Sequence, residues 1–390
     1  MSGNHPTFTP QDFTLVEDPH HGKIVSALNL ISQTWNYAGI PFGVGRVELV
    51  GTAPEYRRRG LVRIQMDTVH RWSLERGELA QAITGIPYYY RQFGYEMALS
   101  LSGGRIGYPA NVPELPSGEA EPYTVRPALE ADLPFIAGLY DEDCSRWLVS
   151  CRRTVGLLRY ELSGRLPLDI NRKELGIITG AEGEAVGFVA YPVSLWTNSI
   201  ALEEYHLLPG VSWLEVTPCI MRFLWRKGQE YAQVAEKGCT SLFFSLGESH
   251  PVYPVFAHRL PRVSLPYAFY LRVPDLTTFL RAIAPVLEKR LAEGIRPGYS
   301  GELRIGFYRS GLLLVFDQGH LLEIRRLGAD ELETVTAGFP GLTFLQILFG
   351  YHTLEELRSA FPDCWVNEDK ARPILEAIFP KQSSSVWPVS

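Results

Sequence analysis

Residues 57–60 are three consecutive arginines followed by a glycine, and they stand where a β-rich run gives way to an amphipathic segment. The first backbone N–H groups of a helix lack partners within the helix and carry a partial positive charge, so they bind anions. Guanidinium groups match the geometry of phosphates, and a glycine lets a phosphate approach the backbone because it has no Cβ. This corner of the chain therefore predicts a binding site for a diphosphate.

Two common phosphate-binding motifs, GxxxxGK[ST] and GxGxxG, do not occur in the sequence. The run before the turn, residues 49–52, would offer the free edge of a strand to an extended ligand. The alternative interpretation is a solvated basic start of a helix with no ligand. A second motif lies downstream, where Tyr90, Gly94 and Tyr95 stand in YRQFGYE, directly after the strand-like run LAQAIT.

Both motifs resemble those of the GNAT superfamily of N-acetyltransferases. Residues 57–62 fit the acetyl-CoA signature [RQ]-x-x-G-x-[GA] at five of six positions, and Val62 stands where Gly or Ala is usual. Tyr90, Gly94 and Tyr95 fit the Tyr-x-x-x-Gly-[FY] run that follows the fifth strand of these domains. The whole layout has two GNAT-like units, of which only the first keeps the turn, and an α+β C-terminal unit. It resembles the Eis (enhanced intracellular survival) family, whose C-terminal domain has a sterol carrier protein-like fold.

The resemblance implies which residues contact acetyl-CoA, the cosubstrate of that family. They give backbone hydrogen bonds to the pantetheine arm, surround the diphosphate, and line the far side of the cofactor. The residues implied for the pantetheine arm are Val50, Gly51 and Thr52. Those implied for the diphosphate are Arg58, Arg59, Gly60, Leu61, Val62 and Arg63, and those for the far side of the cofactor are Gly85 and Ile86. The alternative for residues 50–52 is a plain core strand.

The resemblance also implies that Tyr90 is the general acid when an amine attacks the thioester directly. A tyrosine with a pKa of about 10 protonates a thiolate whose thiol has a pKa of about 8.5. The alternative is that Tyr90 is aromatic packing. In the resembled family the base is the C-terminal carboxylate, after an aromatic last residue; here the last residue is Ser390, with Trp387 close by. Glu48 is the second candidate for the base. The alternative for Ser390 is a frayed terminus, and the alternative for Glu48 is a solvent-facing strand residue.

The composition is that of a globular protein of 390 residues with a net charge of −6 at pH 7. That charge argues against a nucleic-acid binder that works by charge alone. Five scattered cysteines lack zinc-site spacing, and His250 and His258 have no partner at metal spacing. We therefore expect free thiols, no metal site and a cytoplasmic location. No apolar run has the length of a signal-peptide core or of a membrane helix, so no membrane partner is predicted.

Hydrophobic periodicity and Gly/Pro-rich breaks predict an α+β (mixed α/β) chain of three domains. The resemblance implies that residues 1–105 are a GNAT acetyl-CoA-binding domain that begins at the second strand of such domains. It implies that residues 120–273 are a second, degenerate GNAT-like domain, which ends in the strand PYAFYLRV, and that residues 274–390 are a sterol carrier protein-like domain.

Within these domains the pattern predicts strands in residues 12–52 and, after Pro54, a helix with Val62, Met66, Val69 and Ser73 on one face that ends near Gly77. It predicts a hairpin over residues 175–191 and a helix from about Pro218 to Lys237. It also predicts one amphipathic helix over residues 275–294 and a tail without a strand period. The strand aromatics Trp35, Tyr37 and Phe42 line an acceptor groove or belong to the core. Residues 141–143 attract a cationic amine or form a solvated face.

The sequence thus predicts an acetyl-CoA-dependent N-acetyltransferase, an acyltransferase whose acceptor is a small cationic amine or a lysine. The resemblance implies a homo-oligomer. The alternative is a non-catalytic acyl-CoA or lipid-binding protein, which would use the apolar C-terminal unit on a GNAT scaffold.

Overall fold

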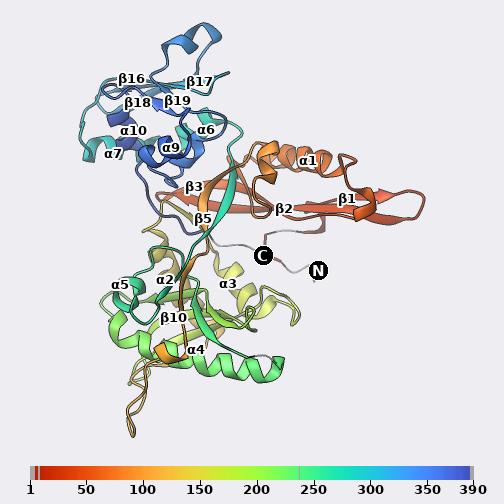
Figure 1. The fold of residues 1–390 in the computed structure, drawn as a ribbon, viewed down its shortest axis with the longest axis vertical. Helices are drawn as coiled ribbons and strands as arrows, with labels where there is room; N and C mark the ends of the chain where they lie inside the picture. Colours follow the sequence, from red (N-terminus) through yellow and green to blue (C-terminus); the bar gives the residue numbers. More distant parts are fainter. Residues whose placement is uncertain (1–4, 8, 237, 387–390) are drawn as a thin grey trace.

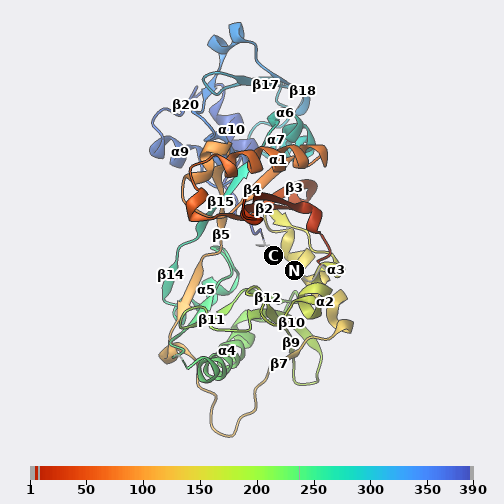
Figure 2. The ribbon, with the colours of Figure 1, turned by 90° about the vertical axis from the view of Figure 1, so that its right-hand side faces the viewer.

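The structure is a computed structural model that describes residues 5–7, 9–236 and 238–386. Three parts follow one another along its long axis (Figures 1 and 2). A large sheet with helix α1 lies in the middle. The α+β unit of the C-terminal residues lies on one side of it, and the unit formed mainly by residues 124–264 lies on the other. The predicted mixed α+β class is confirmed.

The central sheet has the strand order β1-β2-β3-β4-β15-β5, with β8 paired to the far end of β2. Its strands are β1 (Phe13–Asp18), β2 (Lys23–Tyr37), β3 (Ile40–Thr52), β4 (Ala80–Ile83), β5 (Glu96–Leu101), β8 (Val149–Cys151) and β15 (Tyr267–Arg272). The strands predicted in residues 12–52 are confirmed. All neighbours are antiparallel except β3 and β4, which run parallel and pair only over residues 44–46 of β3.

Helix α1 (Leu61–Glu75) covers one face of the central sheet. Its buried residues Gln65, Met66, Val69 and Ser73 recur at helical spacing, and the two apolar ones share a core with strands β2 and β3. The helix ends just before Gly77, whose φ of +72° suits a glycine after a helix C-terminus. The predicted helix and its end are confirmed.

Strand β15 lies between β4 and β5, although the sequence pattern assigned it to the second unit. Phe269, Tyr270 and Leu271 are fully buried there because both faces of the central sheet are covered. In return, β6 (Gly104–Gly107) leaves the first unit and pairs with β13 (Ser241–Phe244) and β14 (Arg262–Ser264). The two units thus exchange strands. The division into domains of residues 1–105 and 120–273 remains a proposal.

The second unit holds two four-stranded sheets, β12-β10-β9-β7 and β11-β13-β6-β14. Its remaining elements are β7 (Thr124–Pro127), β9 (Lys173–Thr179), β10 (Ala185–Pro192), β11 (Ser199–Leu202), β12 (Glu204–Leu207), α2 (Leu133–Cys144), α3 (Val155–Arg159), α4 (Trp213–Ala235) and α5 (Val252–Phe256). The hairpin predicted over residues 175–191 is confirmed by the antiparallel pair β9 and β10.

The predicted start of α4 at Pro218 is wrong. The helix begins at Trp213, because Ser212 caps it by accepting a hydrogen bond from the backbone N–H of Glu215. Pro218 lies inside the helix. The capping serine, rather than the proline, is the sequence feature that sets this start.

The C-terminal unit combines a five-stranded sheet, β18-β17-β16-β19-β20, with five helices among the described residues. These elements are α6 (Leu276–Ala282), α7 (Ala284–Glu293), β16 (Gly301–Gly306), β17 (Gly311–Asp317), β18 (His320–Arg326), β19 (Ala337–Gly338), α8 (Phe344–Leu348), α9 (Leu354–Ala360), β20 (Trp365–Val366) and α10 (Arg372–Ile378). The single helix predicted over residues 275–294 is wrong. Pro285 has no N–H to continue it and clashes with the preceding turn, so the chain forms α6 and α7.

The C-terminal unit shares one core with the central sheet. The ring centroid of Tyr37 lies 6.0 Å from that of Phe279 and 6.2 Å from that of Phe349. The ring centroid of Phe42 lies 5.3 Å from that of Phe279. Trp35 and Tyr37 are fully buried, so the strand aromatics belong to this core and the acceptor-groove interpretation is wrong.

Two further expectations concern the whole chain. The cysteines are all free thiols, as predicted: Cys144, Cys151, Cys219, Cys239 and Cys364. No helix within the described ranges has both the length and the apolar character that crossing a membrane requires.

Replacing Phe279 by Ala should lower the free energy of unfolding by about 3–5 kcal/mol, because it leaves a cavity between the C-terminal unit and the central sheet. Urea denaturation followed by tryptophan fluorescence measures the change. Leu322→Ala, at a side chain that is 67% exposed in the same unit, is the control and should change it by less than about 0.5 kcal/mol. Equal effects of the two variants would contradict the shared core.

Candidate active site

A cavity of about 700 Å³ opens between the end of β3, the start of α1 and the short helix η3 (Tyr89–Phe93). It gathers most of the predicted cofactor residues. Those that line it are Val50, Gly51, Thr52, Arg58, Gly60, Leu61, Val62, Arg63 and Ile86, and Tyr90 lines it as well. Arg59 and Gly85 are not among its lining residues. A volume of this size is within the range of ligand sites.

The cavity exists because β3 continues after its pairing with β4 has ended. Beyond Arg46 the strand runs on to Thr52 without β4 beside it. Leu49 has a φ of +55°, and the register with β2 shifts at this point, which is a β-bulge. A bulge turns the backbone out of its regular alternation, so the edge of residues 50–52 faces the cavity.

The arginine–glycine turn leaves the start of α1 open. Arg58 and Gly60 both have left-handed backbone conformations, with φ of +64° and +78°. Gly60 is the N-cap of α1, and no described side chain caps this helix. The first N–H groups of α1 are therefore available to an anion. A Cβ at Gly60 would meet no protein atom within 4 Å, which shows free space beside the backbone.

The three arginines of the turn have different surroundings. Arg58 lines the cavity and so does Arg57, whose Nε lies 3.4 Å from the carbonyl oxygen of Thr52. Arg59 instead lies over the ring of Tyr56, 4.8 Å from its centroid, and donates to the carbonyl of Glu55. The structure therefore does not bring Arg59 to the cavity with the rest.

A hydrogen bond that the sequence did not predict fixes this turn to the end of β1. The hydroxyl of Tyr56 donates to the carboxylate of Asp18. This bond, together with those from His21 and from the backbone N–H of His20, lowers the pKa of Asp18 to about 2. The carboxylate is thus ionised at neutral pH and stays available to hold the turn. No motif joins two residues so far apart in the sequence.

Tyr90 is the buried member of three adjacent tyrosines. Its side chain is 5% exposed, whereas Tyr88 and Tyr89 are exposed. Burial, helped by Tyr89 and Glu48, raises the pKa of Tyr90 to about 12, so the phenol carries its proton at neutral pH. Gly85 packs against it, since a Cβ there would lie 3.2 Å from the Tyr90 ring. Gly85 thus leaves room for the Tyr90 ring and does not line the cavity.

Glu48 lies two residues before the cavity edge and is already bound. Its Oε1 accepts hydrogen bonds from Arg46, with Nε at 2.7 Å and Nη2 at 2.5 Å. Arg46 therefore already occupies one oxygen of the Glu48 carboxylate.

Ser390, the other candidate for the base, lies outside the described residues. The described part of the tail pairs in parallel with β8, since the N–H of Leu148 donates to Ser383 and that of Ser385 donates to Val149, both at 2.9 Å. No helix or strand is assigned to the described part of the tail, which agrees with its lack of a strand period, but an isolated bridge joins it to β8. Because β8 is antiparallel to β2, residues 383–386 lie beside β8 and point in the direction that leads along β2 from Tyr37 toward Asn29. Asn29 is the partner of Glu48 in the sheet.

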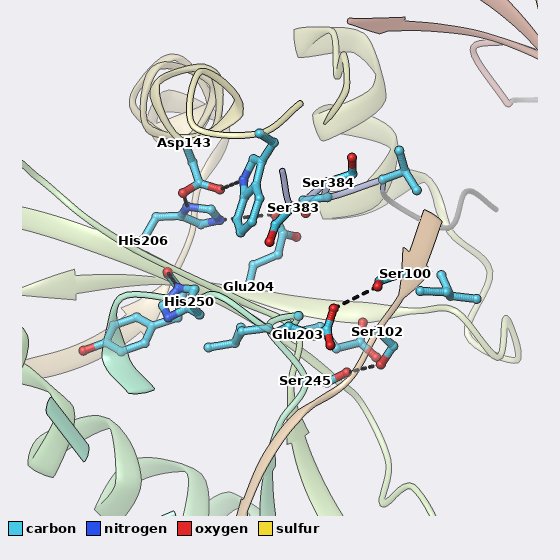
Figure 3. Close-up of a pocket in the computed structure, with 18 of the residues that line it drawn as sticks. Ser100, Ser102, Asp143, Glu203, Glu204, His206, Ser245, His250, Ser383 and Ser384 are labelled. Carbon is cyan, nitrogen blue, oxygen red and sulfur yellow. Dashed lines mark hydrogen bonds and ion pairs between the residues drawn. The ribbon is translucent and has the colours of Figure 1, made fainter. Parts of the chain in front are cut away.

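A second cavity, of about 170 Å³, lies where the central sheet, the second unit and the tail meet (Figure 3). Asp143 of the acidic run 141–143 lines it. His250 lines it too, with Nε2 2.9 Å from the carbonyl of Tyr205, and burial lowers its pKa to about 3. His258 stacks on Phe256. Neither histidine belongs to a metal-ligand cluster among the described residues.

Residues 2–98 match the family described as "Acetyltransferase (GNAT) domain". The N-terminal part of the chain is therefore similar in sequence to GNAT domains. The match indicates acyl transfer as the general class of reaction for this domain. No curated protein has a matching sequence.

Solved structures share the fold over almost the whole chain. A conserved protein of Enterococcus faecalis, described as a probable N-acyltransferase, has a TM-score of 0.66 at 15% identity, covering 94% of this chain and 86% of its own. A GCN5-related N-acetyltransferase of Kribbella flavida has a TM-score of 0.64 at 17% identity, covering 97% and 88%. Eis1 of Mycobacterium abscessus has 0.59 at 15% identity, covering 97% and 89%. At these identities the likeness concerns the GNAT fold alone.

Replacing Arg58 by Ala should weaken the binding of coenzyme A about fivefold to tenfold, because a guanidinium beside the phosphates is lost. Isothermal titration calorimetry at low salt measures the change, which should shrink as salt screens the charges. Arg71→Ala is the control, since Arg71 lies on the same helix, is exposed and does not line the cavity. Equal losses in both variants would mean that only the overall charge matters.

Proposed function

We propose that the protein is an acetyl-CoA-dependent N-acetyltransferase. The observation that carries the proposal is the cavity that runs from the uncapped start of α1 to the buried Tyr90. One end suits the diphosphate of coenzyme A, because it has free N–H groups, open space beside Gly60 and two arginines. The edge of residues 50–52 suits the amide-bearing pantetheine arm, which would add to β3 as an extended chain.

In the proposed reaction the amine nitrogen forms a bond to the carbonyl carbon of the acetyl group. The bond between carbon and sulfur breaks, its electron pair goes to the sulfur, and the proton lost by the nitrogen finally reaches that sulfur. Tyr90 would stand at the departing sulfur. A phenol with a pKa of about 12 is a weaker acid than a thiol of about 8.5, so it stabilises the thiolate mainly as a hydrogen-bond donor.

We propose the carboxylate of Ser390 as the group that takes the proton from the attacking ammonium. Residues 383–386 lie beside β8 and point toward the end of β2 where Asn29 pairs with Glu48, and this direction supports the role. Glu48 is the weaker candidate because Arg46 holds it. The proposed acceptor is a primary amine on a small cationic molecule or a lysine, and a cytoplasmic homo-oligomer is proposed from the family resemblance.

Release of free coenzyme A thiol from acetyl-CoA, measured with a panel of primary amines, tests the function. The proposal expects turnover with at least one amine, and the acetylated amine should appear by mass spectrometry. Binding of acetyl-CoA without turnover on any amine would favour the alternative, a non-catalytic acyl-CoA or lipid-binding protein.

Replacing Tyr90 by Phe should lower kcat about a hundredfold and leave the Kd of acetyl-CoA within about twofold, because the hydroxyl acts on the departing sulfur. Steady-state kinetics and calorimetry measure the two effects. Tyr89→Phe, at the exposed neighbouring ring, is the matched control and should keep its kcat. An unchanged kcat in Tyr90→Phe would remove the phenol from the mechanism.

Deleting residues 387–390 should reduce kcat about a hundredfold without changing the melting temperature, because the carboxylate is withdrawn while the paired segment 383–386 stays. Trp387→Ala keeps the terminal carboxylate and controls for loss of the side chain. Turnover that survives the deletion would assign the base elsewhere, with Glu48→Gln as the next variant.

A further inference from the structure

The second unit repeats the strand opening that forms the cofactor cavity in the first. β11 and β13 pair in parallel over residues 199–202 and 241–244, as β3 and β4 do over a shorter stretch. The chain then continues as β12, which leaves β13 and pairs with β10. Residues 203–206 and 245–248 line the 170 Å³ cavity that lies in this opening (Figure 3).

The helix that follows this opening has lost the features of an anion site. The segment before α4, residues 207–212, contains no basic residue. Ser212 caps the helix by accepting from the N–H of Glu215, which places a carboxylate in the first turn. A diphosphate would therefore find a capped helix and negative charge there, in contrast to the uncapped start of α1.

The charge of the cavity itself is negative. Among the described residues, its lining contains four carboxylates, Asp143, Glu203, Glu204 and Glu248, and no lysine or arginine. The two histidines in the wall add no positive charge at neutral pH, because burial lowers the pKa of both His206 and His250.

Two of the carboxylates, Asp143 and Glu203, are already bound by neighbouring side chains. Asp143 accepts from Arg146 and, at 2.8 Å, from the indole of Trp147. Glu203 lies 2.6 Å from the amine of Lys173. Glu248 stands at the exposed rim, where its Oε2 accepts from Ser100 at 2.8 Å.

Glu204 is the buried carboxylate of the set, with 4% of its surface exposed. Its Oε2 is bound by Arg153, which also binds Glu161. Its Oε1 is buried and has no hydrogen-bond partner among the described residues. In Figure 3 the carboxylate is turned toward His206 and Ser383 in the cavity wall. A buried charged acceptor without a donor is costly, and a ligand that supplies an N–H would remove that cost.

We propose that this cavity is a binding site for a small organic ammonium ion. The ammonium donates to Oε1 of Glu204 and is attracted by Glu248 at the rim. The methylenes of the ligand pack on Trp147, Tyr140 and Leu246, which belong to the same wall. The small volume suits an aliphatic amine of a few carbons. Such an ion is either an acceptor of the proposed reaction or an effector that is not acetylated. Only the role as an acceptor rests on the proposed function.

Titration of the full-length protein with 1,4-diaminobutane, without acetyl-CoA, tests the site by calorimetry. The diamine should bind, and 1,4-butanediol, of equal length but uncharged, should not. Glu204→Gln should weaken diamine binding more than tenfold, because a charged acceptor is lost. Glu248→Gln, at an exposed position that leaves folding intact, should weaken it about threefold. Glu182→Gln, in the exposed β9–β10 turn, is the matched control and should change nothing.

Equal binding of the diol, or diamine binding that neither Glu204→Gln nor Glu248→Gln weakens, would overturn the proposal. So would absence of diamine binding to the unchanged protein. A second arm adds acetyl-CoA: acetylated diamine with a raised KM and unchanged kcat in Glu248→Gln identifies an acceptor site, and binding without product identifies an effector site. Because the first arm contains no acetyl-CoA, its result does not depend on whether the protein is an acetyltransferase.

Discussion

The structure depends on one constraint, the short pairing of two parallel strands. β3 and β4 share only residues 44–46 and 80–82, after which β3 continues to Thr52 with a bulge at Leu49. A strand edge without a neighbour must find other hydrogen-bond partners, and here it borders a cavity. The start of α1 and the buried Tyr90 close the two ends of that cavity.

The exchange of β15 and β6 places the two units on one framework. β15 closes the gap between β4 and β5, and the hydroxyls of its Tyr267 and Tyr270 donate to the carbonyls of Gly85 and Ile86. The chain that leaves the unit of residues 124–264 thus returns to the central sheet as β15 and helps to hold the segment that carries Tyr90. This arrangement gives a physical reason for keeping that unit in the chain even though the segment before its helix α4 lacks the arginines.

The sequence predicted the local elements well wherever periodicity and turn residues agreed. The long strands before Pro54, the helix that ends at Gly77 and the hairpin over residues 175–191 all follow from their patterns. The pattern of β15 predicts a strand, but nothing in it specifies the partner, because burial on both faces is satisfied by either sheet. Pro218 suggests a later start for α4, but the side chain of Ser212 caps the helix and starts it at Trp213.

The candidate site was predictable in part for a similar reason. Backbone turns and adjacent charges, such as Arg58 and Gly60, are local and visible in the sequence. The bond from Tyr56 to Asp18, and the Glu204 oxygen that no described residue binds, arise from chain segments that meet only in the fold. No spacing in the sequence encodes them.

A crystal structure of the protein with coenzyme A bound tests the central claim most directly. The account predicts that the diphosphate oxygens accept hydrogen bonds from the backbone N–H groups that open α1, with the guanidinium of Arg58 beside them and the thiol directed toward the hydroxyl of Tyr90. A nucleotide bound elsewhere on the protein, with this corner left vacant, would contradict it.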